Sequence, residues 1–330
     1  MTDQAAFSAA TLAIDLAAET DRIVAGLRGQ LRGMRKRGLV LGLSGGIDSS
    51  VCVALAVKAV GPKNVFCLFM PENDSDPESL RLGRLVAETF GVDAVVEDIG
   101  PSLQAMGCYE RRDGFIRQLV PEYGPGWASK IVIANSVATE GYNISYLVVQ
   151  DPAGVQQKLR MPPAVYLGIV AATNMKQRTR KQLEYYHADR LNFAVLGTPN
   201  RLEYDQGFFV KNGDGAADVK PIAHLYKTQV YALAAHLGVP AEICRRPPTT
   251  DTYSLAQTQE EFYFSLPYDR MDLCLYGLNH GLSAAETGAA AGLTPVEVER
   301  VWTDIAAKRS ATRYLHLGPQ LVAEVPELKG

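Results

Sequence analysis

Several features that mark common functional classes are missing from this sequence. Lysine and arginine (33) do not outnumber aspartate and glutamate (36), and the formal net charge is −3. No global basic field is therefore available to attract nucleic acid. No apolar run approaches the roughly 18 residues of a membrane-spanning helix. The first residues show no basic head followed by an apolar block. We therefore expect no signal peptide, no membrane association and a cytoplasmic location.

Cysteine and histidine are too scattered for a metal or disulfide framework. The five cysteines contain no Cys-x-x-Cys pair, and the five histidines form no cluster with ligand spacing. We therefore expect no zinc site, and we expect most cysteines to be small buried residues in a reducing compartment. The cysteines are Cys52, Cys67, Cys108, Cys244 and Cys274, and the histidines are His187, His224, His236, His280 and His316.

The most informative stretch that is present runs from residue 39 to residue 56. An apolar run typical of a buried parallel strand is followed by a small-residue turn and then by a segment with helical period. A strand, a glycine turn and a helix start together present backbone N–H groups and a positive helix end to a phosphate. Asp48 adds a carboxylate that could hold Mg²⁺ beside the phosphates. The expected phosphate contacts are Ser44, Gly45, Gly46, Asp48, Ser49 and Ser50.

This turn matches neither GxxxxGK[ST] nor GxGxxG, which excludes the P-loop kinase and dinucleotide-fold fingerprints. It resembles the SGGxDS loop of the ATP pyrophosphatase superfamily, whose members cleave ATP between the α- and β-phosphates. Ser44, Gly45, Gly46, Asp48 and Ser49 occupy every specified position of that loop. The resemblance implies that ATP is a substrate and that the loop holds the departing pyrophosphate.

Strands and helices alternate over much of the chain. We expect strands at 64–71, 92–99 and 193–198, a helix at 78–90 and another that opens at Asn174. This order predicts an α/β fold with a parallel sheet and helices on both faces, in which ligands lie at the carboxyl ends of the strands. With the loop resemblance, it indicates a Rossmann-like three-layer α/β/α fold (adenine nucleotide alpha-hydrolase-like).

Two parts of the chain are expected from composition and pattern. An α/β domain covers 1–260 and includes a variable segment, 101–170, that packs on the sheet or covers the site. A helical segment, 261–330, packs on that domain. Within it, Ser283 and Thr294 are expected N-caps of a structural helical hairpin. Early glutamates disfavour a DNA-reading role for its second helix.

A second block, at 174–310, resembles the ammonia-dependent NAD synthetase family. That family has Gly-Thr at a strand end, a glutamate five residues later, a Gly-[FY]-Phe-x-Lys segment with Gly-Asp-Gly, and a Tyr-Lys-Thr-Gln helix start. The matching residues are Asn174, Arg178, Arg180, Gly197, Thr198, Glu203, Gly207, Phe208, Phe209, Lys211, Gly213, Asp214, Gly215, Ala217, Asp218, Lys227, Thr228, Gln229, Thr249, Tyr268, Asp272, Lys308 and Arg309.

The resemblance implies roles for several of the matching residues. Asp48 and Glu203 would share Mg²⁺, and Lys211 and Lys227 would stabilise charge on the transferred phosphoryl group. The catalytic residues would be Asp48, Lys211, Lys227 and Asp214. Beyond the phosphate loop, ATP would contact Arg178, Thr198, Lys227 and Thr249. The acceptor would contact Asn174, Lys211, Asp214 and Asp218, of which the two aspartates would orient the ammonia or the pyridine portion.

The acceptor side departs from the family pattern. Gln259 stands where an aspartate is expected, and Phe262 where a glutamate is expected. Pro199 and Asn200 replace a polar pair, and Asn212 replaces a tyrosine. The favoured function is still a homodimeric NAD synthetase that adenylates deamido-NAD and transfers ammonia, supplied free or by a separate amidotransferase. The alternative is a related adenylating amide ligase on another carboxylate. A tRNA-modifying enzyme or a non-catalytic nucleotide sensor is less favoured.

Substitution of the two expected metal ligands tests the ligase interpretation. Asp48→Asn and Glu203→Gln should each abolish substrate-dependent pyrophosphate release because each removes a carboxylate from the magnesium site. A coupled assay for pyrophosphate measures the outcome. Full activity in either variant would contradict the assignment of that residue.

Overall fold

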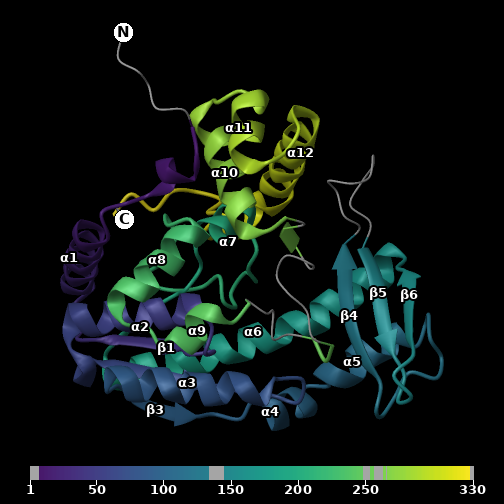
Figure 1. Cartoon of the computed structure of the whole chain (residues 1–330). Coiled ribbons are helices and arrows are strands. Elements are labelled where there is room, and N and C mark those ends of the chain that lie inside the picture. Colours follow the sequence, from purple (N-terminus) through teal and green to yellow (C-terminus); the bar gives the residue numbers. More distant parts are fainter. Residues whose placement is uncertain (1–6, 134–144, 248–252, 256–262, 265, 328–330) are drawn as a thin grey trace.

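The protein is represented by a computed structural model that describes residues 7–133, 145–247, 253–255, 263–264 and 266–327 (Figure 1). The elements in chain order are η1 (Ala9–Leu12), α1 (Leu16–Met34), β1 (Leu39–Gly42), α2 (Ile47–Val60), η2 (Pro62–Asn64), β2 (Val65–Phe69), α3 (Pro77–Phe90), β3 (Asp93–Val96), α4 (Gly100–Ala105), α5 (Cys108–Ile116), β4 (Ala128–Ile133), β5 (Ser145–Gln150), β6 (Gln156–Arg160), α6 (Pro163–Leu191), β7 (Ala194–Val195), α7 (Arg201–Gln206), α8 (Lys227–Leu237), α9 (Ala241–Arg245), α10 (Tyr268–His280), α11 (Ala284–Ala291), α12 (Pro295–Thr312) and η4 (Arg313–His316).

A parallel sheet with strand order β3-β2-β1-β7 forms the centre of the fold. In its register, Leu39 pairs with both Val65 and Ala194. The carboxyl ends of these strands therefore meet at one edge, where the loops after β1, β2 and β7 come together. The fourth expected strand is shorter than predicted: β7 has two residues, and its continuation is a single bridge between Leu196 and Val219.

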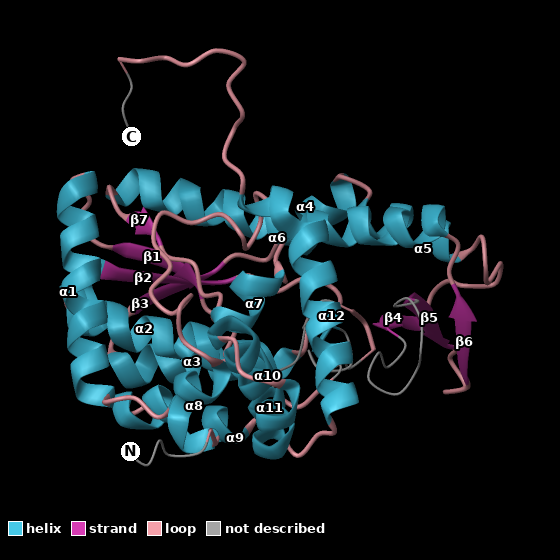
Figure 2. Ribbon diagram, turned by 90° about the horizontal axis from the view of Figure 1, so that it is seen from above, coloured by secondary structure: helices cyan, strands magenta, loops and turns pink. Residues whose placement is uncertain are grey.

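Helices cover both faces of the parallel sheet (Figure 2). On one face, α1, α2, α3, α8 and α9 enclose an apolar core with β1 and β2, and on the other, α4, α5 and α6 pack against Val40, Leu68 and Val195. The strands read as near-continuous apolar runs because both faces are buried. The predicted three-layer α/β/α architecture is confirmed.

The segment that the sequence left without a clear period contains a second sheet. After α4 and α5, strands β4, β5 and β6 form an antiparallel sheet, drawn at one end of α6 in Figure 1. The prediction that a helix opens at Asn174 is wrong, because α6 begins at Pro163. Its first turns bury Val165 and Ile169 against Ile131 and Leu147 of the small sheet, so the helix extends beyond the parallel sheet that it covers.

The C-terminal helices form the predicted extension. Ser283 accepts a hydrogen bond from Glu286 N at 3.2 Å and Thr294 accepts one from Glu297 N at 3.3 Å, so both predicted N-caps are confirmed. Helices α10, α12 and α7 share an apolar core. The proposed division at residue 260 falls in a part of the chain outside the described residues and stays a prediction. None of the described helices is long and apolar enough to cross a membrane.

Candidate active site

The phosphate loop has the predicted strand–turn–helix geometry. Gly46 is the N-cap of α2 with extended backbone and without a capping side chain. Ser49 and Ser50 donate their hydroxyls to the carbonyl of Gly46 at 3.0 and 2.7 Å. Ser44 accepts from Gly46 N at 3.3 Å. The backbone N–H groups at the start of α2 thus remain available to an anion, which the helix dipole favours at this end.

Gly45 is required by the way the loop packs on α3. Its φ is +74°, a conformation that side chains rarely adopt. A Cβ at this position would lie 2.7 Å from the carbonyl oxygen of Ser79 and 2.8 Å from Cβ of Leu82. The loop therefore rests directly on the backbone of α3, and only glycine permits this approach.

The starts of three helices bring the predicted metal ligands to one point. The ammonium of Lys227, the first residue of α8, donates to Oδ2 of Asp48 in the first turn of α2. Asn200, the N-cap of α7, donates its side-chain amide to the other oxygen of Asp48 at 3.1 Å. Its backbone N–H donates to Glu203 Oε2, also at 3.1 Å. Asp48 and Glu203 are therefore bridged by Asn200, a residue that the sequence marked only as a departure.

Electrostatics in this cluster reflect two acids and one buried cation. Burial raises the pKa of Glu203, and the charge of Asp48 raises it further, to about 8. Burial lowers the pKa of Lys227, but Asp48 and Glu203 outweigh that effect, so the net pKa of this lysine is raised and it stays charged. Asp272 supports Lys227 from behind by accepting the N–H groups of Lys227 and Thr228 at 3.2 and 2.7 Å.

A cavity of about 1200 Å³ opens beside the cluster. Single-ligand pockets usually enclose about 300–1,000 Å³, so this one has room for two substrates. Its walls come from the phosphate loop, the loop after β2, one face of α6, the segment after β7, and α12. Predicted site residues on this lining are Ser44, Gly45, Gly46, Asp48, Ser49, Asn174, Arg178, Thr198, Glu203, Lys211 and Asp214.

The acceptor-side residues have less uniform surroundings. Asp214 lines the cavity, and its carboxyl accepts a hydrogen bond from Val210 N at 2.7 Å. Desolvation by the surrounding protein raises the pKa of this carboxyl. Lys211 lines the cavity but directs its ammonium to the carbonyls of Tyr314 and Leu317, both at 2.8 Å. Arg178 donates to the carbonyl of Lys211 at 3.2 Å.

Some predicted residues are not brought to the cavity wall. Among the described residues, Ser50, Lys227 and Asp218 are absent from its lining. Lys227 reaches the site through Asp48, whereas Asp218 accepts from Val195 N at 2.7 Å and so fastens the end of β7. Thr249, Gln259 and Phe262 lie outside the described residues.

The structure also adds charged residues that the sequence analysis did not assign to the site. Lys181 donates to Glu184 Oε2 at 2.5 Å, and both are buried in the cavity wall on α6. Burial raises the pKa of Glu184. Lys308 donates to Asp304 at 2.7 Å on α12. Opposite charges at helical spacing usually indicate a solvated face, so the sequence offered no signal that these pairs face a cavity.

Comparison with known proteins identifies the family. The sequence pattern of the family described as NAD synthase matches residues 19–118 and 131–312. The chain belongs to this family. Curated relatives named NH(3)-dependent NAD(+) synthetase are 84% identical in Rhizobium meliloti, covering 98% of this chain and 97% of that protein, and 68% identical in Rhizobium rhizogenes, covering 97% of each. The resemblance seen in the two motif blocks is therefore confirmed.

Solved structures of lower identity show the same fold. NMN synthetase from Francisella tularensis superposes with a TM-score of 0.65 at 21% identity, covering 94% of this chain and 99% of that one. An NH3-dependent NAD synthetase from Campylobacter jejuni gives 0.60 at 20% identity, covering 94% and 100%. At this distance the likeness establishes the fold of the NAD synthase chain and not its substrate.

Gly45→Ala tests the packing of the phosphate loop. The added methyl group would meet the backbone of α3, so we expect a loss of ATP binding together with a lower unfolding temperature, measured by calorimetry and thermal unfolding. Gly281→Ala is a matched control: this glycine is in the left-handed region with φ +68° and ψ 27°, and no atom lies within 4 Å of the added Cβ. The substitution should cost only the left-handed strain of about 1–2 kcal/mol. Equal ATP affinity in the two variants would contradict this packing argument.

Glu203→Gln tests the raised pKa through stability. Folded Glu203 keeps its proton up to about pH 8, whereas the unfolded side chain releases it near its model value of 4.5. The wild type therefore loses stability as the pH rises between these values. The variant lacks this loss, so its unfolding temperature relative to wild type should be higher at pH 8 than at pH 5. An identical difference at both pH values would refute the assignment.

Proposed function

We propose that this chain catalyses the ATP- and ammonia-dependent conversion of deamido-NAD to NAD, with AMP and pyrophosphate as the other products. Family membership and the curated names of relatives at 84% and 68% identity support this activity. The observation that carries it is structural: the helix start at Gly46, the carboxylates of Asp48 and Glu203, and the buried ammonium of Lys227 meet beside one large cavity.

The chemistry proceeds in two transfers. A carboxylate oxygen of the acceptor attacks the α-phosphorus of ATP, the bond to the bridging oxygen breaks, and pyrophosphate leaves with that electron pair. Ammonia then attacks the carbonyl carbon of the mixed anhydride, loses a proton, and expels AMP. In this proposal, the N–H groups at the start of α2 and the hydroxyl groups of Ser44 and Ser49 bind the departing pyrophosphate.

Asp48 and Glu203 fit a Mg²⁺ ion. The mutual repulsion that raises the pKa of Glu203 is what a divalent cation relieves, and Lys227 supplies only one compensating charge. No group of three or more candidate protein ligands occurs among the described residues, so phosphate oxygens and water would supply the remaining ligands. The bound ion would neutralise charge on the phosphates and the leaving group.

Basic and acidic residues of the cavity complete the proposal. Lys227 holds Asp48 in place and adds positive potential behind the phosphates. Lys211 exchanges its contacts with the carbonyls at 314 and 317 for a phosphoryl oxygen. Asp214, with its raised pKa, is suited to accept the proton that the attacking nitrogen releases.

Nucleotide and acceptor contacts are assigned from the family resemblance. Arg178 and Thr198, which line the cavity, are assigned to ATP, and Asn174, which also lines it, to the acceptor. The resemblance assigns Thr249, which lies outside the described residues, to ATP as well. Asp218 keeps no substrate role in this proposal because its carboxylate is committed to the backbone of β7. A homodimer is proposed from the family resemblance, and light scattering of the purified protein measures the assembly.

Pyrophosphate release with different acceptors tests the function. With ATP, Mg²⁺ and ammonia present, addition of deamido-NAD should stimulate release strongly over the acceptor-free rate, and NAD should form in equal amount. Deamido-NMN is the parallel arm, since one fold relative is named NMN synthetase. Stimulation by deamido-NMN alone would refute the proposed acceptor and retain the amide ligase. No stimulation by any carboxylate would refute the ligase itself.

A further inference from the structure

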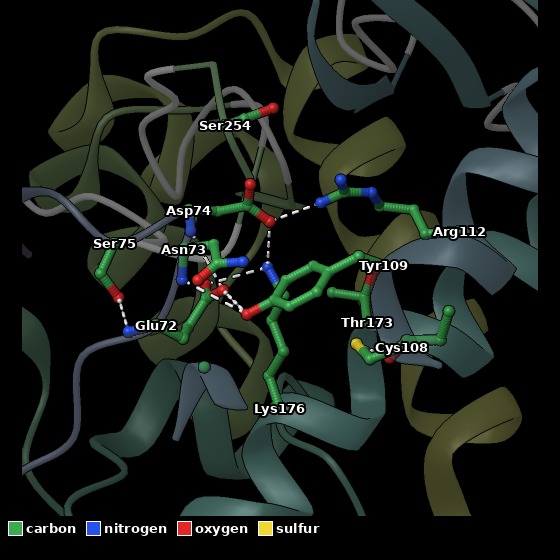
Figure 3. Close-up of polar contacts among 12 residues, drawn as sticks. Glu72, Asn73, Asp74, Ser75, Cys108, Tyr109, Arg112, Thr173, Lys176 and Ser254 are labelled. Atoms are coloured by element: carbon green, nitrogen blue, oxygen red, sulfur yellow. Dashed lines mark hydrogen bonds and ion pairs between the residues drawn. The ribbon is translucent and has the colours of Figure 1, made fainter. Parts of the chain in front are cut away.

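A buried network of charges lies behind the loop that follows β2 (Figure 3). The ammonium of Lys176 donates to Glu72 Oε1 at 3.0 Å and to Asp74 Oδ2 at 2.6 Å. Arg112 donates to the same oxygen of Asp74, and the hydroxyl of Tyr109 donates to Glu72 Oε2 at 2.8 Å. We call these five residues the loop-72 network. Lys176 is 1% exposed and the side chain of Glu72 is fully buried.

Each charge of the network faces an opposite charge. Lys176 and Arg112 face the carboxylates of Glu72 and Asp74, and Arg112 also donates to Asp113 at 2.8 Å. These attractions offset part of the cost of removing the charges from water. Burial by itself would raise the pKa of Asp74, but the charges of Lys176 and Arg112 outweigh it and hold this pKa below its ordinary value. Asp74 is therefore an ionised partner and not a stray buried carboxyl, and loss of one member would leave an opposite charge without its partner.

The same side chains fix the backbone of the loop. Successive N–H groups are held: Glu72 N donates to Ser75 Oγ at 3.1 Å, Asn73 N to the hydroxyl of Tyr109 at 3.3 Å, and Asp74 N to Glu72 Oε2 at 3.0 Å. The conformation of residues 72–75 is thus set by the network and not by regular secondary structure. Any displacement of Lys176 or Arg112 would be passed to this loop.

The loop forms a wall of the ATP cavity, whereas the two cations do not. The loop lies next to the phosphate loop, since Gly45 rests on Ser79. The cavity-lining residues of the loop and of the start of α3 are Glu72, Ser75, Asp76, Pro77, Ser79 and Leu80. Within the described residues, Lys176 and Arg112 are not part of this lining. Lys176 nevertheless lies on α6 between Asn174 and Arg178, which face the cavity from the other side. It therefore joins two opposing walls.

Helix α5 supplies two of the five members of the network. Tyr109 and Arg112 lie on α5, directly before the small antiparallel sheet. Cys108 fastens this helix to α6 by donating its thiol to the carbonyl of Ala172 at 3.3 Å. Segment 101–170, whose sequence pattern gave no clear prediction, is thereby connected to the nucleotide side of the cavity.

We propose that the loop-72 network positions the wall that encloses the triphosphate of ATP, with Lys176 and Arg112 as positioning residues that act through loop 72–76 without touching the nucleotide. The inference rests on the proposed function because it assigns the neighbouring cavity to ATP. It gives α5 a role in nucleotide affinity: the helix fixes the loop from outside the site.

A charge-neutral double variant provides the test. Arg112→Met with Asp74→Asn removes the pairs of Asp74 with Arg112 and Lys176 and the pair of Arg112 with Asp113. It keeps the pair of Lys176 and Glu72 and changes no cavity-lining residue. We expect the KM for ATP to rise about tenfold, equivalent to about 1.4 kcal/mol. The KM for deamido-NAD and kcat should change much less, because the loop borders the triphosphate. The single variant Arg112→Lys keeps the charge beside Asp74, so its KM for ATP should lie between the values of the wild type and the double variant.

A stability control separates positioning from general weakening. Leu275→Ala in α10 removes fully buried apolar atoms from a core cluster that contains no member of the loop-72 network, at a cost of about 2–5 kcal/mol. It should lower the unfolding temperature and leave the KM for ATP unchanged at a temperature well below unfolding. If the double variant behaves as this control does, the proposal is overturned.

Direct ATP binding separates failure of this inference from failure of the proposed function. Isothermal calorimetry with ATP and Mg²⁺, without acceptor, measures affinity for wild type and the double variant. Weaker binding by the variant supports the positioning role even if no acceptor is turned over. Equal binding by the two proteins refutes it, whether or not the wild type makes NAD. No ATP binding by wild type would refute both.

Discussion

The ion pair between Lys227 and Asp48 is the constraint on which the site depends. It joins the first turns of α8 and α2, and Asn200 adds the start of α7 through its bond to the other oxygen of Asp48. Three helix N-termini thus converge at the carboxyl edge of one parallel sheet. Each contributes partial positive charge, and together they favour a highly anionic ligand. The parallel sheet therefore positions the helix starts that produce the positive electrostatic potential of the site.

Buried lysines recur around this cavity, and each has a carboxylate partner. Lys227 pairs with Asp48, Lys176 with Glu72 and Asp74, Lys181 with Glu184, and Lys308 with Asp304. Such pairs contribute little net stability because desolvation offsets their attraction. Because these pairs share one cavity, we infer that they position the residues of the site and add little to the free energy of unfolding. A chain selected for stability alone would do as well with apolar residues at these positions.

Local signals made much of the fold predictable. The phosphate loop, the first two strands and the capped helical hairpin depend on short patterns, and they occur where expected. The antiparallel sheet was not predicted, since β6 is mostly exposed and its sequence lacks a clean alternation of apolar and polar residues. The start of α6 was missed because its first turns are buried by that same sheet. Asn200 and Lys176 owe their importance to partners more than 100 residues distant along the chain.

The bonds from Lys211 to the carbonyls of Tyr314 and Leu317 carry a practical consequence. Tyr314 and Leu315 line the substrate cavity, and residues 318–327, which follow, are exposed. Loss or displacement of residues 314–317 would leave the Lys211 ammonium without these two acceptors, so kinetic measurements require protein in which this stretch is intact.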